Sequence, residues 1–137
     1  MKGFLSQLRK VIPHIIGGKM KKNNKTHKEW KCELSPQEFH ITREGGTEAP
    51  FSNKYVNHYE TGSYQCVCCG TDLFISEHKY NSKTGWPSYN QPVNEKVLNE
   101  KDDISNNMIR TEVKCKNCDA HLGHVFLDKS QKTGKRY

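Results

Sequence analysis

Four of the six cysteines form two Cys-x-x-Cys pairs, Cys66 with Cys69 and Cys115 with Cys118. A two-residue spacer lets the chain turn so that both thiolates face one ion at about 2.3 Å. Four thiolates favour tetrahedral zinc and leave no open coordination position, so we predict one structural zinc ion. Two disulfides or four buried free thiols are the alternatives, and paired Cys-x-x-Cys turns with charged neighbours favour zinc.

The two pairs lie far apart in the sequence. The 45 residues between them exceed the ~15–20 of a compact zinc ribbon. We therefore expect the ion to join two distant hairpins of one larger domain. Cys68 lies inside the first pair, where a Cys-x-Cys arrangement would be the poorer chelate, so we interpret it as a buried or free thiol.

Two further segments carry residue types that could do chemistry. The turn Gly85-Trp86-Pro87 holds an indole in a rigid backbone, and His121 and His124 stand on either side of a glycine. Each has a purely structural interpretation, with Trp86 as a core aromatic and the histidines as buried, hydrogen-bonded side chains. These residues alone do not separate binding from packing.

The elements that must position these residues are mostly strands. Ser35-Pro36-Gln37-Glu38 is a capping box with proline at the first helical position, and it predicts a short helix to about Arg43 that Gly45-Gly46 ends. Thr47 to Gly62 is rich in turn formers and should wrap irregularly over the domain. From Ser63 onward the pattern predicts a mainly β domain.

The clearest strand runs from Met108 to Lys114. Ile109, Thr111 and Val113 alternate with three charged residues, as in a strand with one buried face. The polar segment Asn94–Asn107 is predicted to be a hairpin end plus loop. Further strands are expected at Tyr64–Val67, Leu73–Ile75 and Leu122–Leu127.

The net charge of +7 comes from the N-terminal end. Residues 1–28 hold eight Lys or Arg and no Asp or Glu, whereas acidic and basic residues nearly balance in the remainder. We predict a disordered basic tail over 1–28 and a folded domain over 29–137, whose near-neutral body argues against nucleic-acid binding. Organelle targeting by the tail is the alternative to a tail without function. No run approaches the roughly 18 apolar residues of a membrane span.

These segments, taken in order, resemble the methionine-(R)-sulfoxide reductase family over roughly residues 29–137. The matching motifs are Leu34-Ser35-Pro36-Gln37-Glu38-Phe39, Gly46-Thr47-Glu48, Pro50-Phe51, Cys66-x-x-Cys69-Gly70, Gly85-Trp86-Pro87-Ser88, and Cys115-x-x-Cys118-Asp119-Ala120-His121-Leu122-Gly123-His124-Val125-Phe126. The resemblance implies a fold of two packed antiparallel sheets with peripheral helices, stapled by one zinc ion. It also implies a shallow active site.

The implied activity is reduction of the R epimer of methionine sulfoxide, free or within proteins, to methionine. By the same resemblance, Trp86 would hold the substrate methyl group. His121 and His124 would hydrogen-bond or protonate the sulfoxide oxygen, with Asp128 orienting and charging the imidazoles. Arg136 would stabilise the ionised nucleophile.

The family's nucleophile follows directly after the Arg-Tyr that stands here as Arg136-Tyr137, where the printed sequence ends. We therefore expect the 137-residue chain to lack reductase activity unless it is extended. Our hypothesis is that a selenocysteine codon was read as a stop. A frameshift, a pseudogene or a deliberate truncation is the alternative. A silent zinc-stabilised protein that binds methionine sulfoxide or nucleic acid is the competing function.

Resolution of the oxidised intermediate needs a further thiol. Thr84 occupies a common position of the family's resolving cysteine, which leaves Cys32, on a mobile entry segment, and Cys68 as candidates; we favour Cys32. Alternatively, thioredoxin or small thiols reduce the intermediate directly. We expect a monomer without membrane or nucleic-acid partners, and a cytoplasmic location, because zinc-bound thiolates suit a reducing interior.

Overall fold

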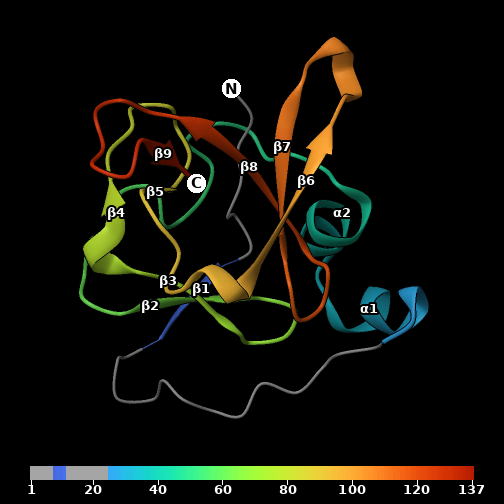
Figure 1. Ribbon diagram of the computed structural model, residues 1–137. Helices are drawn as coiled ribbons and strands as arrows, with labels where there is room; N and C mark the ends of the chain where they lie inside the picture. Colours follow the sequence, from blue (N-terminus) through green and yellow to red (C-terminus); the bar gives the residue numbers. More distant parts are fainter. Residues whose placement is uncertain (1–7, 12–24) are drawn as a thin grey trace.

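Nine strands in three antiparallel sheets make up most of the structure, a computed structural model that describes residues 8–11 and 25–137 (Figure 1). The first sheet has the order β1 (Leu8–Val11), β2 (Ser63–Cys66) and β3 (Asp72–Ile75). A two-stranded ribbon contains β4 (Lys79–Tyr80) and β5 (Ser88–Tyr89). The third sheet has the order β6 (Leu98–Asp103), β7 (Arg110–Cys115), β8 (His121–Leu127) and β9 (Lys135–Arg136). Short 3-10 turns span Ser76–His78, Glu95–Val97 and Ser105–Asn107.

Two short helices precede the strands of the domain, α1 (His27–Glu33) and α2 (Pro36–Glu44). In both, a capping-box hydroxyl accepts a backbone N–H bond three residues later, from Glu29 to Thr26 at 3.2 Å and from Glu38 to Ser35 at 3.1 Å. Such caps satisfy backbone donors that have no partner within a helix. The predicted helix from Pro36 is confirmed. The helix α1 was not expected from the sequence, because its Thr26 cap lies in the predicted tail.

The predicted strands are confirmed with small shifts of their ends, as β2, β3, β7 and β8. The prediction for Asn94–Asn107 is wrong in part, because this segment contains the six-residue strand β6. It pairs with β7 along its whole length, from Leu98 opposite Cys115 to Asp103 opposite Arg110. Its middle residues are exposed and polar, so it has no alternating pattern, and backbone pairing rather than a buried face stabilises it.

The aromatic core lies between the sheets. Tyr64, Phe74 and Tyr89 are fully buried. The ring of Phe74 stacks on Tyr89 with centroids 4.4 Å apart, and Tyr64 meets Tyr89 edge-on at 5.2 Å. Val113 of β7 is also fully buried in this cluster. The expectation of a mainly β fold with packed antiparallel sheets is confirmed, and β4–β5 forms an additional ribbon.

The N-terminal part differs from the predicted disordered tail. Leu8–Val11 pairs with β2, with Leu8 opposite Cys66 and Val11 opposite Ser63. The predicted boundary between residues 28 and 29 falls within α1. Residues 1–7 and 12–24 of the predicted tail lie outside the described residues. Among the described helices, none is both long and apolar enough to traverse a bilayer.

Candidate functional site

The four cysteines of the two pairs converge on one point. Cys66 ends β2 and Cys115 ends β7, and each begins a tight turn that carries the second cysteine of its pair. Each turn is closed by a 2.8 Å backbone hydrogen bond, from Gly70 N to Cys66 O and from Asp119 N to Cys115 O. The residue that closes each turn has a positive φ, 78° at Gly70 and 60° at Asp119. The two turns therefore repeat the same geometry at distant points of the sequence.

The sulfur atoms have the spacing that a tetrahedral metal needs. All four Sγ atoms lie within 4.8 Å of one another, with Cys66–Cys118 at 3.7 Å and Cys69–Cys115 at 3.6 Å. Thiolates at about 2.3 Å from zinc would be separated by roughly 3.8 Å. The four cysteines could thus hold one metal ion, as the sequence predicted. Cys68 is partly buried and stands outside this group.

The electrostatics of the four thiols also fit a cation. The Cys66 thiol donates to neighbouring sulfurs, Cys115 first among them, and this raises its pKa, whereas hydrogen bonds donated by Cys115 and Cys118 hold the pKa of Cys69 well below its usual value. Some thiols keep their protons so that others can ionise, and a bound divalent cation would let all four ionise together. The side chain of Arg43 adds positive charge, since its Nη2 donates to Cys118 Sγ at 3.5 Å and its guanidinium lies over the Trp30 ring at 4.6 Å.

A β-bulge brings the two histidines to the same face of β8. Residues three apart on a regular strand point to opposite faces. Here Val113 pairs with Gly123 and Lys114 with His121, so Leu122 is the extra residue of a bulge. Gly123 has a φ of 146°, which favours glycine. The imidazoles of His121 and His124 consequently lie side by side, with ring centroids 5.6 Å apart.

Each imidazole contacts a carboxylate from a neighbouring strand. His121 Nδ1 lies 2.6 Å from Glu112 Oε2 of β7, and His124 Nε2 lies 2.7 Å from Asp103 Oδ2 of β6. Both imidazoles are buried. Burial lowers the pKa of both histidines, and the adjacent carboxylates oppose that shift in part. Asp103 and Glu112 were not among the site residues expected from the sequence; for Glu112, the polar face of the strand at 108–114 was the one signal.

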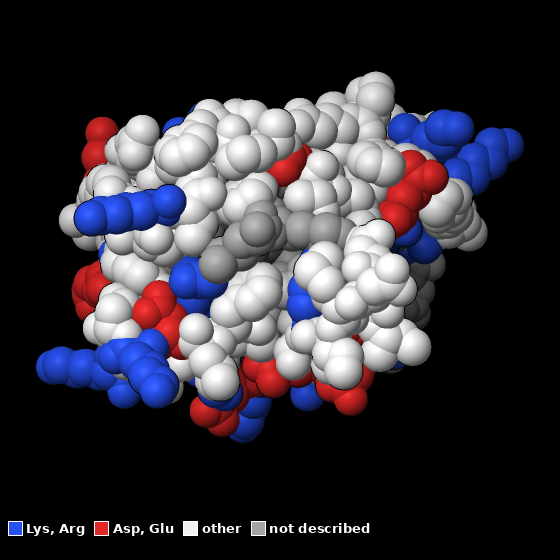
Figure 2. All heavy atoms as spheres, turned by 90° about the horizontal axis from the view of Figure 1, so that it is seen from above, with Lys and Arg blue, Asp and Glu red and all other residues white. Residues whose placement is uncertain are grey.

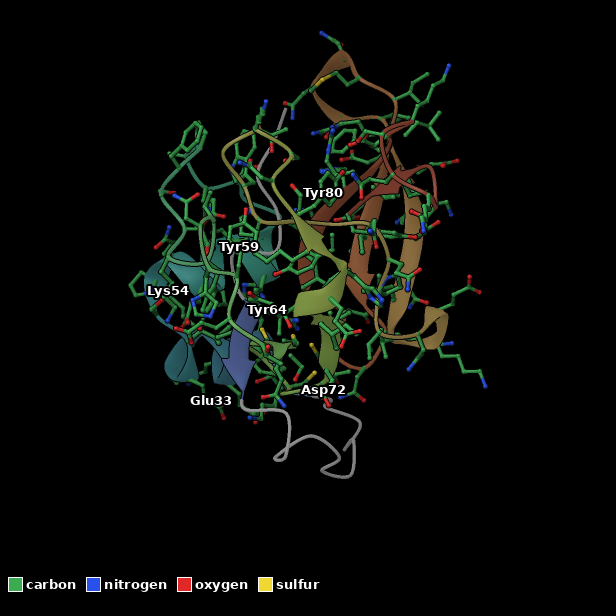
Figure 3. All side chains as sticks on the ribbon, turned by 90° about the vertical axis from the view of Figure 1, so that its left-hand side faces the viewer. Glu33, Lys54, Tyr59, Tyr64, Asp72 and Tyr80 are labelled. Atoms are coloured by element: carbon green, nitrogen blue, oxygen red, sulfur yellow. The ribbon has the colours of Figure 1, made fainter. Side chains whose placement is uncertain are left out.

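The prediction that Asp128 orients the imidazoles is wrong. Its carboxylate accepts a hydrogen bond from the Tyr80 hydroxyl at 2.6 Å and another from Arg136 Nη1 at 3.4 Å (Figure 3 labels Tyr80). Hydrogen bonds from Ser130 and Tyr80 hold the pKa of Asp128 below its usual value. Asp128 therefore orients Arg136, whose guanidinium also lies over the Phe126 ring at 5.2 Å.

Trp86 lies in a closely packed turn. Gly85 has a φ of 95°, and a Cβ at this position would approach Pro50 Cβ to 2.7 Å, so only glycine fits. The Phe51 amide donates to Gly85 O at 2.6 Å, and Trp86 Nε1 donates to Glu48 O at 3.2 Å. Trp86 as a whole residue is 9% exposed, so it is mostly buried. The turn thus holds Trp86 in one orientation.

The C-terminal residue returns to the strand that follows Trp86. Tyr137 and Tyr89 exchange both backbone hydrogen bonds, at 2.9 Å and 2.7 Å. Arg136 of β9 pairs with Phe126 of β8, which lies two residues beyond His124 on the same strand. The structure therefore brings together His121 with His124, and Arg136 with Asp128, and it sets the C-terminus beside the Trp86 turn.

Cys32 does not lie on a mobile entry segment as the sequence analysis proposed. It is an exposed residue of α1. Figure 1 shows α1 at the lower right of the molecule and the C-terminus at the upper left. Resolution by Cys32 within one chain would therefore need α1 to move.

The carboxyl group of Glu48 is expected to make the stability of the protein depend on pH. Burial raises the pKa of its carboxyl to about 7, and the hydrogen bond from Asn53 offsets only part of this shift. Because the folded-state pKa lies above the unfolded one, the native state binds this proton more tightly, and its stabilising effect is lost as pH rises through about 7. We expect Glu48→Gln to gain about 1–2 kcal/mol over the wild type at pH 8, after discounting for solvent screening.

Thermal unfolding between pH 4.5 and 8.5 measures this gain. The gain in the free energy of unfolding should be near zero at about pH 4.5 and level off above about pH 7. Glu44→Gln is the matched control, because Glu44 is about half exposed and its replacement should change stability little. A Glu48→Gln gain that is independent of pH would contradict the raised pKa.

The structure is a small, mainly β domain with four cysteines that could hold one metal ion. Residues 34–137 match the SelR domain family. The chain is 54% identical over 118 residues to the "Peptide methionine sulfoxide reductase MsrB" of Acinetobacter baylyi, covering 86% of this chain and 85% of that protein. It is 50% identical over 109 residues to the protein of the same name from Synechococcus sp., covering 80% of each. The chain belongs to the SelR family of methionine-(R)-sulfoxide reductases.

Proposed function

We propose that this protein reduces the R epimer of methionine sulfoxide, free or within proteins, to methionine, with a cysteine or selenocysteine after Tyr137 as nucleophile. The observation that carries the proposal is the pair of buried imidazoles that the β8 bulge sets on one face, 5.6 Å apart. Two adjacent groups that can donate protons suit a sulfoxide oxygen that must leave sulfur.

In this proposal the substrate methyl group lies against the Trp86 indole. The nucleophile attacks the sulfoxide sulfur, and an imidazolium of His121 or His124 supplies a proton to the oxygen. The resulting hydroxyl group then moves from the substrate sulfur to the nucleophile, as both the S–O bond and the new bond between the nucleophile and the substrate sulfur break. The nucleophile is oxidised by two electrons to a sulfenic or selenenic acid, and methionine is released. Two external thiols then reduce this acid to regenerate the nucleophile, with one water and one disulfide as products.

The backbone pairing at the C-terminus supports this position for the nucleophile. Tyr137 lies opposite Tyr89, so a following residue in the same antiparallel register would lie opposite Ser88, two residues from Trp86. Because side chains alternate along a strand, its side chain would point to the same side as Arg136. That guanidinium would favour an ionised nucleophile.

We further propose that the metal is one structural zinc ion held by the four-cysteine group. When bound, zinc would supply a cross-link between the turn after β2 and the turn after β7. The contact of Arg43 with Cys118 supports this assignment, because positive charge beside a thiolate offsets the negative charge of a zinc–tetrathiolate site.

The proposed partners are protein-bound or free methionine sulfoxide, with thioredoxin or small thiols as reductant. The location of Cys32 on α1 favours an external reductant over resolution within the chain. We propose a cytoplasmic monomer that does not bind nucleic acid. In support, Figure 2 shows Lys and Arg interspersed with Asp and Glu around one face and no single basic patch.

Extension of the chain tests the proposed function directly. Three proteins would be compared. The first is the 137-residue chain. The second adds a cysteine after Tyr137, followed by the C-terminal residues of a SelR-family relative, and the third carries serine in place of that cysteine. We expect only the cysteine form to consume methionine-(R)-sulfoxide with thioredoxin or dithiothreitol, and to leave the S epimer intact. A cysteine-extended, zinc-loaded and folded chain that leaves the R epimer untouched would falsify the proposal.

A further inference from the structure

The two imidazoles contact their carboxylates through different ring nitrogens. Asp103 binds Nε2 of His124 at 2.7 Å, whereas Glu112 binds Nδ1 of His121 at 2.6 Å. An ionised carboxylate only accepts hydrogen bonds, so the nitrogen that it contacts must carry the hydrogen. The neutral forms are therefore opposite tautomers, with hydrogen on Nε2 in His124 and on Nδ1 in His121.

The second ring nitrogen of His124, Nδ1, has no structural role as a hydrogen-bonding group in the described part of the chain. This atom is buried and has no hydrogen-bond partner among the described residues. Buried polar atoms of folded proteins normally have partners, and exceptions often mark a functional site. The remaining nitrogen of His121, Nε2, belongs to a ring that borders a cavity of about 430 Å³ between the α1–α2 pair and β7–β8.

We propose that Asp103 and Glu112 are positioning residues of the reductase site, which fix opposite tautomers and so present Nδ1 of His124 and Nε2 of His121 to the sulfoxide oxygen. This inference rests on the proposed function. The two carboxylates come from β6 and β7, and both histidines come from β8, so the register of three strands creates the arrangement.

The tautomers determine when each histidine can act. In the neutral rings the presented nitrogens carry lone pairs, and a sulfoxide oxygen is itself an acceptor, so neither neutral ring can bind it. After protonation, the presented nitrogen becomes a donor and the carboxylate on the other side stabilises the imidazolium. As the S–O bond breaks, that proton moves to the oxygen, which leaves with the oxidised nucleophile, and the neutral tautomer is restored.

Other charges act on the same rings. Arg110 Nη2 bonds to Asp103 at 3.2 Å and disfavours protonation of His124, as does the adjacent His121. Lys114 disfavours protonation of His121, and Asp103 favours it. The charged residues of the helix side that border the His121 cavity are Lys25, Arg43 and Glu44.

Ring-nitrogen NMR of the ¹⁵N-labelled chain tests the inference without turnover. At pH 8 the wild type should show hydrogen on Nε2 of His124 and on Nδ1 of His121. Asp103→Asn should lower the pKa of His124 by about one unit, roughly a tenfold loss of proton affinity, because it removes an anionic partner. Glu112→Gln should do the same to His121, and it serves as the second test should Asp103→Asn not fold.

Glu77→Gln is the matched control. Glu77 is exposed in the 3-10 turn Ser76–His78 and is not among the charged groups that act on either ring, so the signals of His121 and His124 should not change. In the cysteine-extended chain, Asp103→Asn should lower kcat for the R-sulfoxide by ~10²-fold with little change in KM, and move the alkaline limb of the pH profile to lower pH, because the protonated imidazole is the active form. Rescue by Asp103→Glu would support a positioning role.

The outcomes separate the two ideas. The inverse tautomer in the wild type, or a His124 pKa that Asp103→Asn leaves unchanged in an active enzyme, would overturn this inference alone. An extended wild type that cannot reduce the R epimer would overturn the proposed function, and with it the catalytic purpose assigned to both carboxylates.

Discussion

Replacement of Cys115 by serine is expected to remove both the bound metal and the cooperative fold. Cys115 is fully buried, and its Sγ lies 3.6 Å from Cys69 Sγ. Structural zinc contributes ~10–16 kcal/mol in zinc-finger peptides, which is comparable to the whole stability of a domain, ~5–15 kcal/mol. With three thiolates, the site would lose the closed coordination that joins the ends of β2 and β7.

Metal analysis and circular dichroism of the purified protein measure this effect. The wild type should carry about one zinc per chain, and Cys115→Ser should carry almost none and unfold without a cooperative transition. Cys32→Ser is the control for a lost thiol, because Cys32 is exposed on α1. Cys68→Ser should also keep its zinc. A Cys115→Ser protein with full zinc content and an unchanged Tm would refute the four-cysteine site.

The second large effect is expected at Phe74. Its side chain is fully buried, stacks on Tyr89 at 4.4 Å and lies 6.1 Å from the Tyr137 ring. Phe→Ala in a packed core costs about 3–5 kcal/mol, since it removes apolar contact and leaves a cavity. We expect a loss of that size in Phe74→Ala, with a decrease in Tm of roughly 10–20 °C.

The same substitution should loosen the C-terminus. Tyr89 and Tyr137 are held in register by two backbone hydrogen bonds and packed together through Phe74. Amide hydrogen exchange at these two residues should accelerate more than at the zinc turns. Phe51→Ala is the control, because Phe51 is 72% exposed and should change stability by no more than about 0.5 kcal/mol. A Phe74→Ala loss below about 1 kcal/mol would show that the cluster does not support the core.

Short-range patterns in the sequence were sufficient to predict several features of the structure. The two-residue spacers predicted the cysteine group, because a tight turn brings both thiolates to one side within four residues. The Ser35 capping box predicted α2 for the same reason, since its hydrogen bonds span three residues. The alternation at residues 108–114 predicted β7, although Ile109 lies outside the strand and is exposed.

Features without a local pattern were missed or misplaced. The strand β6 is polar and exposed along most of its length, and only pairing with β7 defines it. The helix α1 has its own capping box, but the high basic charge around it favoured a prediction of disorder. The strand β1 depends on β2, its partner from a distant part of the sequence.

The sequence by itself determined which residues could do chemistry: four cysteines, two histidines, a tryptophan and an arginine. Only the tertiary structure decided which of them act on one another. In the structure Asp128 contacts Arg136, whereas His124 contacts Asp103 and His121 contacts Glu112. The physical reason is that a hydrogen bond between strands depends on register, and a single extra residue in β8 moves a side chain to the opposite face.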